Sequence, residues 1–276
     1  NSFSLQLGAS SAADGGANSN KELCSSIAVD SLGNTHCFGN TNGATVNTGG
    51  GDTDILIQKM DSNGKLVRSI QLGASYGNTA GADTCNDVTV DSDDNLYCAG
   101  TTNADLGEGN GGGFDAVVFK MNPAGEIVWL TQFGDTTKKG GQNNTLADEC
   151  YGVAVDDLGN VYCAGSTMSS MGEANAGGRD AFVMKLDTNG DLVWLTQVGV
   201  TTGAGGAGGS DDCNDVVVDD SYNVFCAGST TGNLAETNGG NADPFIIKLN
   251  SSGVLQWKKQ LGTTTVFNND TSGGSS

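Results

Sequence analysis

The stretch CSSIAVDSLGNTHC at residues 24–37 decides the fold of this chain, because it recurs three more times with a cysteine at each end. Successive copies begin 61, 65 and 63 residues apart, and together they use all eight cysteines. A constant period of this size indicates a repeat architecture in which each repeat forms one supersecondary unit. The other copies are CNDVTVDSDDNLYC at 85–98, CYGVAVDDLGNVYC at 150–163 and CNDVVVDDSYNVFC at 213–226.

Each repeat contains four short segments with the alternation of β-strands. The first follows the first cysteine and is rich in valine, and the second carries the second cysteine. A long polar loop leads to the third segment, which starts at an aspartate, and the fourth ends in the pattern Gln-x-Gly. Tight turns join the first to the second and the third to the fourth, so neighbouring strands are predicted to be antiparallel.

These features predict an all-β protein, a β-propeller of four blades with about 62 residues and four antiparallel strands each. A β-sandwich would not repeat so regularly, and a solenoid coil would be shorter. The propeller is predicted to be a single domain over residues 1–262, with a tail or linker at 263–276. The repeats are expected at about 9–73, 74–134, 135–199 and 200–262, after an extra outer-type strand at 3–8.

The strings GGRDAFVMKLDTNGDLVWLTQVG at 177–199 and VVVDDSYNVFCAGST at 216–230 resemble the bacterial SBBP-type β-propeller repeat. The resemblance recurs four times and covers nearly the whole chain. It implies a secreted or cell-surface protein that serves as a scaffold or adhesion module. The paired cysteines depart from the family pattern and favour a variant reinforced by disulfides.

The regular, even use of cysteine predicts an oxidising, extracellular compartment and one structural disulfide in each blade. Across the turn the paired positions fall three or four residues out of register, whereas a disulfide needs Cα atoms within about 7 Å. We therefore expect the first cysteine to lie in a loop that bends back, or else to bond an adjacent blade; the bond within the blade is favoured. The predicted pairs are Cys24 with Cys37, Cys85 with Cys98, Cys150 with Cys163, and Cys213 with Cys226.

The only histidine, His36, occupies a position that Tyr97, Tyr162 and Phe225 fill in the other repeats. We interpret it as a packed ring and not as a metal ligand, since no other metal-binding motif surrounds it. There is no G-x-S-x-G, H-E-x-x-H or phosphate-loop motif. The chain is expected not to be an enzyme; a hydrolase would need asymmetric acids in a central pocket.

The formal charge of −20, from 32 acidic and 12 basic residues, excludes the basic patches that bind nucleic acid or anionic lipid. No apolar run reaches the length of a membrane span, so no membrane insertion is expected. The chain begins at Asn1 without a methionine, and we expect a processed chain or a fragment.

Two acids recur in every repeat, one before the first cysteine and one at the start of the third strand. They are expected at the rim that carries the long loops, where binding residues tend to lie. No cofactor is required, but eight carboxylates could bind calcium, which prefers oxygen ligands. Alternatively, each acid accepts hydrogen bonds from loop amides and orders its own blade. The acids are Glu22, Asp54, Asp83, Asp115, Asp148, Asp180, Asp211 and Asp243.

The fourth-strand pattern occurs five times, because SFSLQLG at 2–8 adds one to the four repeats. This surplus strand, with Phe3, Leu5 and Leu7, could complete a blade of a neighbouring subunit, belong to a longer array, or cover an edge of its own ring. We expect an extracellular structural or surface protein that assembles with itself into filaments by strand exchange or stacking. The alternative is an adhesin or glycan-binding module that uses the long loops, with calcium, and binds a surface glycan or protein.

Overall fold

The computed structural model describes residues 21–43, 53–73, 75–76, 79–107, 113–134, 146–201 and 208–262. Over these residues the chain is all β, as predicted, with four sheets of four antiparallel strands and a two-stranded ribbon. Each four-stranded sheet lies within one repeat, and its strands follow one another in sequence order. We name these sheets blades 1 to 4. No helix in the described ranges is long and apolar enough to span a membrane.

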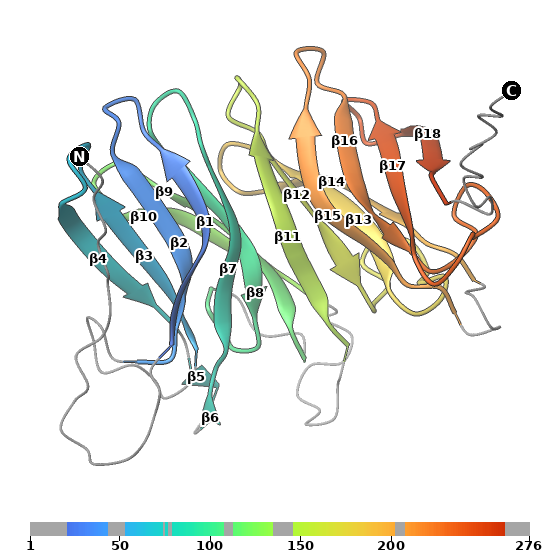
Figure 1. Ribbon diagram of the computed structural model, residues 1–276, viewed down its shortest axis with the longest axis horizontal. Coiled ribbons are helices and arrows are strands. Elements are labelled where there is room, and N and C mark those ends of the chain that lie inside the picture. Colours follow the sequence, from blue (N-terminus) through green and yellow to red (C-terminus); the bar gives the residue numbers. More distant parts are fainter. Residues whose placement is uncertain are drawn as a thin grey trace, which may run out of the picture.

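The strands are short and similar in length in every blade (Figure 1). Blade 1 contains β1 (Glu22–Val29), β2 (Thr35–Thr41), β3 (Asp54–Met60) and β4 (Leu66–Leu72); the ribbon of β5 (Ser75–Tyr76) and β6 (Thr79–Ala80) follows it. Blade 2 contains β7 (Asp83–Val90), β8 (Leu96–Thr102), β9 (Asp115–Met121) and β10 (Ile127–Phe133). Blade 3 contains β11 (Asp148–Val155), β12 (Val161–Thr167), β13 (Asp180–Leu186) and β14 (Leu192–Val198). Blade 4 contains β15 (Asp211–Val218), β16 (Val224–Thr230), β17 (Asp243–Leu249) and β18 (Leu255–Gln260).

The tight turn between the first and second strands of each blade is fixed by an aspartate that accepts hydrogen bonds from the backbone of its own turn. In blade 3, Asp156 Oδ1 accepts from the amides of Leu158 at 3.0 Å and Asn160 at 2.8 Å. Gly159 has φ of +79°, a conformation that glycine adopts without a steric cost. The hydroxyl of Tyr162 donates to Asp156 Oδ2 at 2.9 Å, which ties the turn to the core. The pattern Asp-x-x-Gly-Asn is therefore a turn with an internal acceptor.

Each blade has two faces of different composition. We call the face that carries the disulfide the cysteine face, and the opposite face, which carries Tyr97, Tyr162 or Phe225 in blades 2 to 4 and His36 in blade 1, the ring face. Three buried clusters form the core, and each joins the ring face of one blade to the cysteine face of the next. Between blades 2 and 3, for example, Tyr97 and Val118 pack against Val153 and Phe182.

In the described ranges the four blades form an open row, and the buried clusters join only blades that are neighbours in sequence. Contacts between blades join β1 to β7, β7 to β11 and β11 to β15, so the first strands of the blades lie next to one another. Figure 1 shows blade 1 and blade 4 at opposite ends of the row. The cysteine face of blade 1 and the ring face of blade 4 are therefore the two ends of the row of described blades.

Candidate functional site

The disulfides join the predicted partners within each blade, and a β-bulge brings them together. Cys150 pairs with Gly165 across the sheet and Val153 pairs with Cys163, with a register shift between Cys150 and Gly152. The Cα atoms of the four bonded pairs are 5.6, 6.0, 6.1 and 5.9 Å apart. Our expectation that the first cysteine lies in a loop was wrong: the first strand begins two residues before it, and one extra residue in the strand corrects the register.

The bulge explains the glycine that follows each second cysteine two residues later. A Cβ at Gly165 would lie 1.7 Å from the carbonyl oxygen of Glu149, which belongs to the backbone of the bulged strand. Equivalent distances at Gly39, Gly100 and Gly228 are all 1.8 Å. Only glycine lets the two strands approach this closely.

The eight predicted acids lie at one end of their sheets, next to a threonine on the strand between them. In blade 3, Thr167 pairs with Asp148 on one side and with Asp180 on the other. Thr167 Oγ1 donates to Asp148, and Gln197 Nε2 donates to Asp180 Oδ2 at 2.9 Å and to the loop carbonyl of Ser169 at 3.0 Å. The acids in these rows are Glu22 and Asp54, Asp83 and Asp115, Asp148 and Asp180, and Asp211 and Asp243.

The Gln-x-Gly pattern follows from the same rows. The glutamine clamps the loop after the second strand to the aspartate of the third strand. A Cβ at Gly199 would lie 2.0 Å from Asp180 Oδ1. Only glycine therefore fits at this position beside the carboxylate. The equivalent distances at Gly73, Gly134 and Gly262 are 1.9, 2.0 and 1.9 Å.

In these contacts most of the acids accept hydrogen bonds within their own blade and order its loops. This is the role that the sequence offered as the alternative to calcium binding. Asp243 Oδ2, for example, accepts from Gln260 Nε2 at 2.9 Å and from the amide of Gly239 at 2.8 Å. Asp180 Oδ1 and Asp211 Oδ1 differ from these oxygens, because they are buried without a hydrogen-bond partner. No three His, Cys, Asp or Glu side chains of the described part of the chain gather as a metal site would require. Calcium binding stays a prediction.

Asp211 is a buried acid whose carboxyl is strongly perturbed. Burial raises its pKa to about 6, and the nearby charge of Asp180 acts in the same direction. An acid with a raised pKa destabilises the folded state when it is ionised, because the unfolded chain releases the proton near pH 4. Its contribution to stability is therefore largest below about pH 4 and is lost as the pH rises through about 6.

Asp211→Asn is expected to raise the melting temperature by a few degrees at pH 7.5, because asparagine can keep the acceptor for the amide of Val200 without a buried charge. The gain should shrink steadily as the pH falls toward 4.5. Melting curves at several pH values measure this, with the exposed Asp191→Asn as the control for the loss of one negative charge. An equal shift in both variants, or a gain independent of pH, contradicts the assignment.

His36 is a packed ring, as predicted. It is 3% exposed, and its Nε2 lies 3.1 Å from Asp30 Oδ2, where Tyr97 and Tyr162 place a hydroxyl on the same turn aspartate. Burial lowers the pKa of His36, which the hydrogen bond to Asp30 opposes. The His36 side chain thus contacts the turn aspartate of blade 1, as the tyrosine does in blades 2 and 3.

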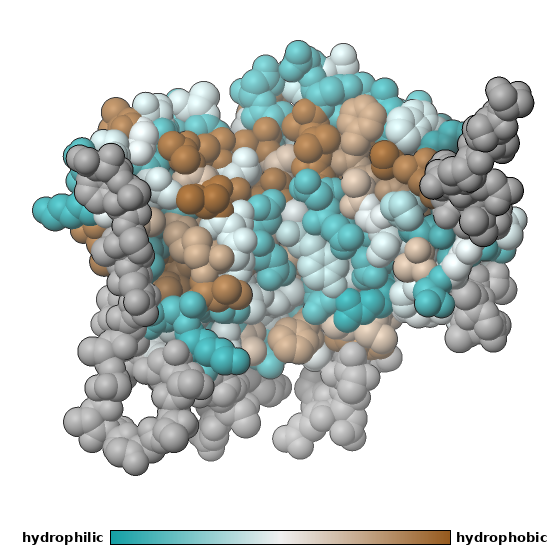
Figure 2. Space-filling model, in the orientation of Figure 1, coloured by the Kyte–Doolittle hydropathy of each residue, from teal (hydrophilic) through white to brown (hydrophobic). Residues whose placement is uncertain are grey.

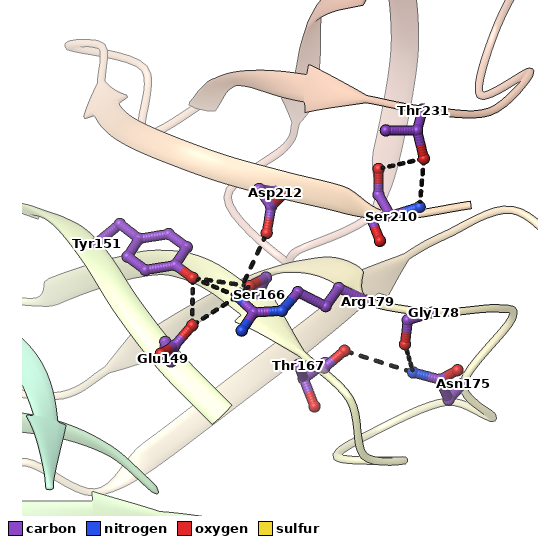
Figure 3. Close-up of polar contacts among 10 residues, drawn as sticks. All are labelled: Glu149, Tyr151, Ser166, Thr167, Asn175, Gly178, Arg179, Ser210, Asp212 and Thr231. Carbon is purple, nitrogen blue, oxygen red and sulfur yellow. Dashed lines mark hydrogen bonds and ion pairs between the residues drawn. The ribbon is translucent and has the colours of Figure 1, made fainter. Parts of the chain in front are cut away.

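One polar cluster breaks the repeat symmetry, on the long-loop rim between blades 3 and 4 (Figure 3). Arg179 Nη1 donates to Glu149 Oε2 at 2.6 Å, to the Tyr151 hydroxyl at 2.8 Å and to Ser166 Oγ at 3.3 Å, and it lies 3.8 Å from Asp212 Oδ1. The Tyr151 hydroxyl also donates to Glu149. Burial and this hydrogen bond raise the pKa of Tyr151 to about 12, so the phenol stays protonated at neutral pH.

This cluster was not predicted from the sequence, although the sequence contains a signal for it. Arg179 precedes the aspartate that begins the third strand of every repeat. At the same position the other repeats have Thr53, Phe114 and Ala242. The guanidinium side chain is 33% exposed, so the cluster can present a cation with fixed orientation at the rim. A departure from the repeat pattern by a charged residue was the sign to look for.

The two ends of the row expose residues that are buried elsewhere in the molecule. On the cysteine face of blade 1, Ile27 is 59% exposed, whereas its counterparts Val88, Val153 and Val216 are 6%, 5% and 3% exposed. On the ring face of blade 4, Ile246 is 37% exposed. Figure 2 shows the hydrophobic side chains that gather over blade 1 at the left of the view.

The predicted assembly strand with Phe3, Leu5 and Leu7 lies outside the described residues. Its pairing stays a prediction.

Comparison with known proteins supports the fold. The sequence matches the model of the SBBP beta-propeller repeat at residues 3–44, 67–108, 128–170 and 193–235. No curated protein matches.

Similar solved structures include an ulvan lyase of polysaccharide lyase family PL25, with 12% identity and a TM-score of 0.49 over 88% of this chain and 56% of that one. The polysaccharide lyase Uly1 is 9% identical with a TM-score of 0.43, over 83% of this chain and 53% of that one. A Bacteroides caccae protein of unknown function is 11% identical with a TM-score of 0.37, over 86% and 81% of the two chains. The chain thus spans little more than half the length of these two lyases, and likenesses this distant carry no argument about function.

Proposed function

The chain belongs to the SBBP β-propeller repeat family, and we propose that it is a structural protein of the extracellular space or cell surface whose copies assemble into filaments. The two ends of its row of blades expose faces that are buried at the junctions between blades. The observation that carries this proposal is the exposure of Ile27 beside the burial of Val88, Val153 and Val216. A blade face that is apolar at every internal junction gains free energy when another surface covers it.

The chemistry of the chain suits such a role outside the cell. Four disulfides persist in an oxidising compartment, where they add stability to a loop-rich chain. The formal charge of −20 keeps the surface well solvated. The proposed role involves no catalysis and requires no cofactor. The partner is a further copy of the protein, joined by stacking of blades or by exchange of the strand at Phe3–Leu7.

Electron microscopy of the native protein over a range of concentrations tests this proposal. We expect filaments, or short chains of copies, whose length grows with concentration. Discrete single particles at every concentration, together with sedimentation as a monomer, would contradict it.

The Arg179 cluster favours a second candidate function, a binding module for a surface glycan or protein on the long-loop rim. A guanidinium that is one-third exposed and held by Glu149 and Tyr151 offers a preorganised donor to carboxylate or hydroxyl groups of a ligand. Glycan-array binding by the wild type that Arg179→Ala abolishes would support this function, provided that the variant melts like the wild type. Binding that survives the substitution would place the ligand elsewhere.

Calcium is part of this second candidate, and melting curves with calcium and with chelator test it. Preferential binding to the folded state is expected to raise the melting temperature by several degrees in calcium. The unpartnered oxygens of Asp180 and Asp211 are the expected ligands, so Asp180→Asn should remove the shift. Equal melting temperatures in calcium and chelator contradict calcium binding.

A further inference from the structure

We propose that the ring face of blade 4 in one copy docks on the cysteine face of blade 1 in a second copy and reproduces the junction that joins the blades within the chain. This inference rests on the proposed function, because it names the surfaces by which copies assemble. The three internal junctions between blades share one arrangement of side chains.

At each internal junction a long side chain of the fourth strand covers a glycine in the next blade. Trp129 lies over Gly190 of blade 3, where a Cβ would lie 2.8 Å from the indole, and its Nε1 donates to the carbonyl of Thr188 at 3.0 Å. Trp194 lies over Gly253 of blade 4, where a Cβ would lie 2.6 Å away, and donates to the carbonyl of Ser251 at 3.2 Å. The glycines have φ of +86° and +79° and sit in the tight turn between third and fourth strands.

The junction between blades 1 and 2 follows the same plan with a different side chain. Arg68 takes the position of the tryptophan, and a Cβ at Gly125 would lie 1.8 Å from its Nη1. The contact therefore depends on position in the blade more than on residue type.

Blade 4 carries the donor half of a fourth junction, and none of the other described blades covers it. Trp257 corresponds to Trp129 and Trp194, and it is 41% exposed. Its ring packs against Phe225 at a centroid distance of 6.2 Å, and Lys248 lies over Phe225 at 5.1 Å, as Lys185 does over Tyr162. The side chains that would enter the contact are thus already arranged.

Blade 1 carries the acceptor half. Gly64 corresponds to Gly190 and Gly253, with φ of +79°, and no atom lies within 4 Å of the position its Cβ would take. The cysteine face of the same blade is hollowed, with a cavity of about 270 Å³ lined in part by Leu23, Ile27, Leu56 and Met60. Leu23 and Ile27 are 55% and 59% exposed.

A second copy is the occupant that these two halves fit. The halves lie at opposite ends of the row in Figure 1, so one copy presents both outward. The ring face of blade 4 also carries two cations, since Lys248 pairs with Trp257 and Lys259 pairs with Ile246 across the sheet. The hollow on blade 1 is lined by Glu22. Charges of opposite sign favour this head-to-tail contact in a chain that is otherwise strongly acidic.

A head-to-tail contact uses two different surfaces, so it can be blocked from either side and restored by mixing. Ile27→Lys blocks the acceptor face and leaves the donor face intact, and Ile246→Glu does the reverse. Sedimentation velocity should show each variant alone as a monomer, and the equimolar mixture as dimers that grow no further. The exposed Leu158→Lys, in a turn of blade 3, is the control and should assemble like the wild type.

A third variant tests the docking of Trp257 directly. Asparagine tolerates positive φ, so Gly64→Asn keeps the turn but places a side chain where the indole must lie. We expect at least a tenfold rise in the dissociation constant and an unchanged melting temperature.

The outcomes separate this inference from the proposed function. If the wild type forms filaments and the three variants do so equally well, the docking surfaces are wrong and assembly uses another contact, such as the strand at Phe3–Leu7. If the mixture of blocked variants stays monomeric while the wild type assembles, the head-to-tail pairing is wrong. If the wild type is a monomer at every concentration, both the inference and the proposed function fail.

Discussion

Replacing Cys150 and Cys163 together by alanine lowers the melting temperature by roughly 5–15 °C in our expectation. Loss of a disulfide that closes a short loop costs about 2–4 kcal/mol, and about 2–4 °C accompany each kcal/mol in a chain of this size. Both cysteines are 0% exposed between blades 2 and 3, so packing is lost as well. Thermal melts followed by circular dichroism measure the shift, and the far-ultraviolet spectrum should keep its β-sheet form.

The matched control is the pair Cys24 and Cys37, which closes a loop of the same length at the open end of the row. Cys24 is exposed there, so its loss removes the cross-link but little packing between blades. We expect a smaller decrease than for Cys150 and Cys163. Equal decreases would mean that the buried sulfurs add nothing to the junction, and unchanged melting in both variants would show that the bonds are not structural.

Gly165→Ala is expected to destabilise the protein by about 3 kcal/mol or more, because a rigid neighbouring group cannot move away from the added methyl group without a large cost in free energy. The new methyl group would meet the carbonyl oxygen of Glu149 at 1.7 Å, and that oxygen belongs to the sheet itself. The β-bulge would have to open, and the disulfide of Cys150 would be strained with it. Chemical denaturation with the disulfides intact measures the loss.

Gly240→Ala provides the control, because no atom lies within 4 Å of the position that its Cβ would take. Its stability should stay within about 0.5 kcal/mol of the wild type, as for other surface substitutions. If Gly165→Ala were equally mild, the close approach of β11 and β12 at the bulge would be disproved.

Periodicity and turn chemistry were enough to predict the blades. The repeated cysteines, the alternating valines and the five-residue turns that begin with Asp and end with Asn are local features that residue type alone reveals. The same holds for the position of His36. The β-bulge was missed because the extra residue has no fixed identity: it lies between Cys150 and Gly152 in blade 3 and at equivalent places in the other blades. The glycine two residues after each second cysteine was the available clue.

The Arg179 cluster and the open row could not be predicted for a different reason. The cluster joins residues from three strands and a loop, and only the fold brings Glu149, Ser166 and Asp212 to the same side chain. Whether a row of blades closes depends on the angle between successive sheets. That angle results from many small packing contacts between the sheets, so no sequence motif predicts it.

In the described part of the chain, each four-stranded sheet consists of four strands that are consecutive in sequence, from the first strand of a blade to its fourth. A gene could therefore lose or duplicate a whole repeat without cutting a hydrogen-bonded sheet, and the remaining blades would meet through junctions of the same kind. Stability in such a stack is a sum over units and the contacts between nearest neighbours. The geometry of the junctions does not fix the number of blades, so this number is determined by gene duplication, gene loss and selection.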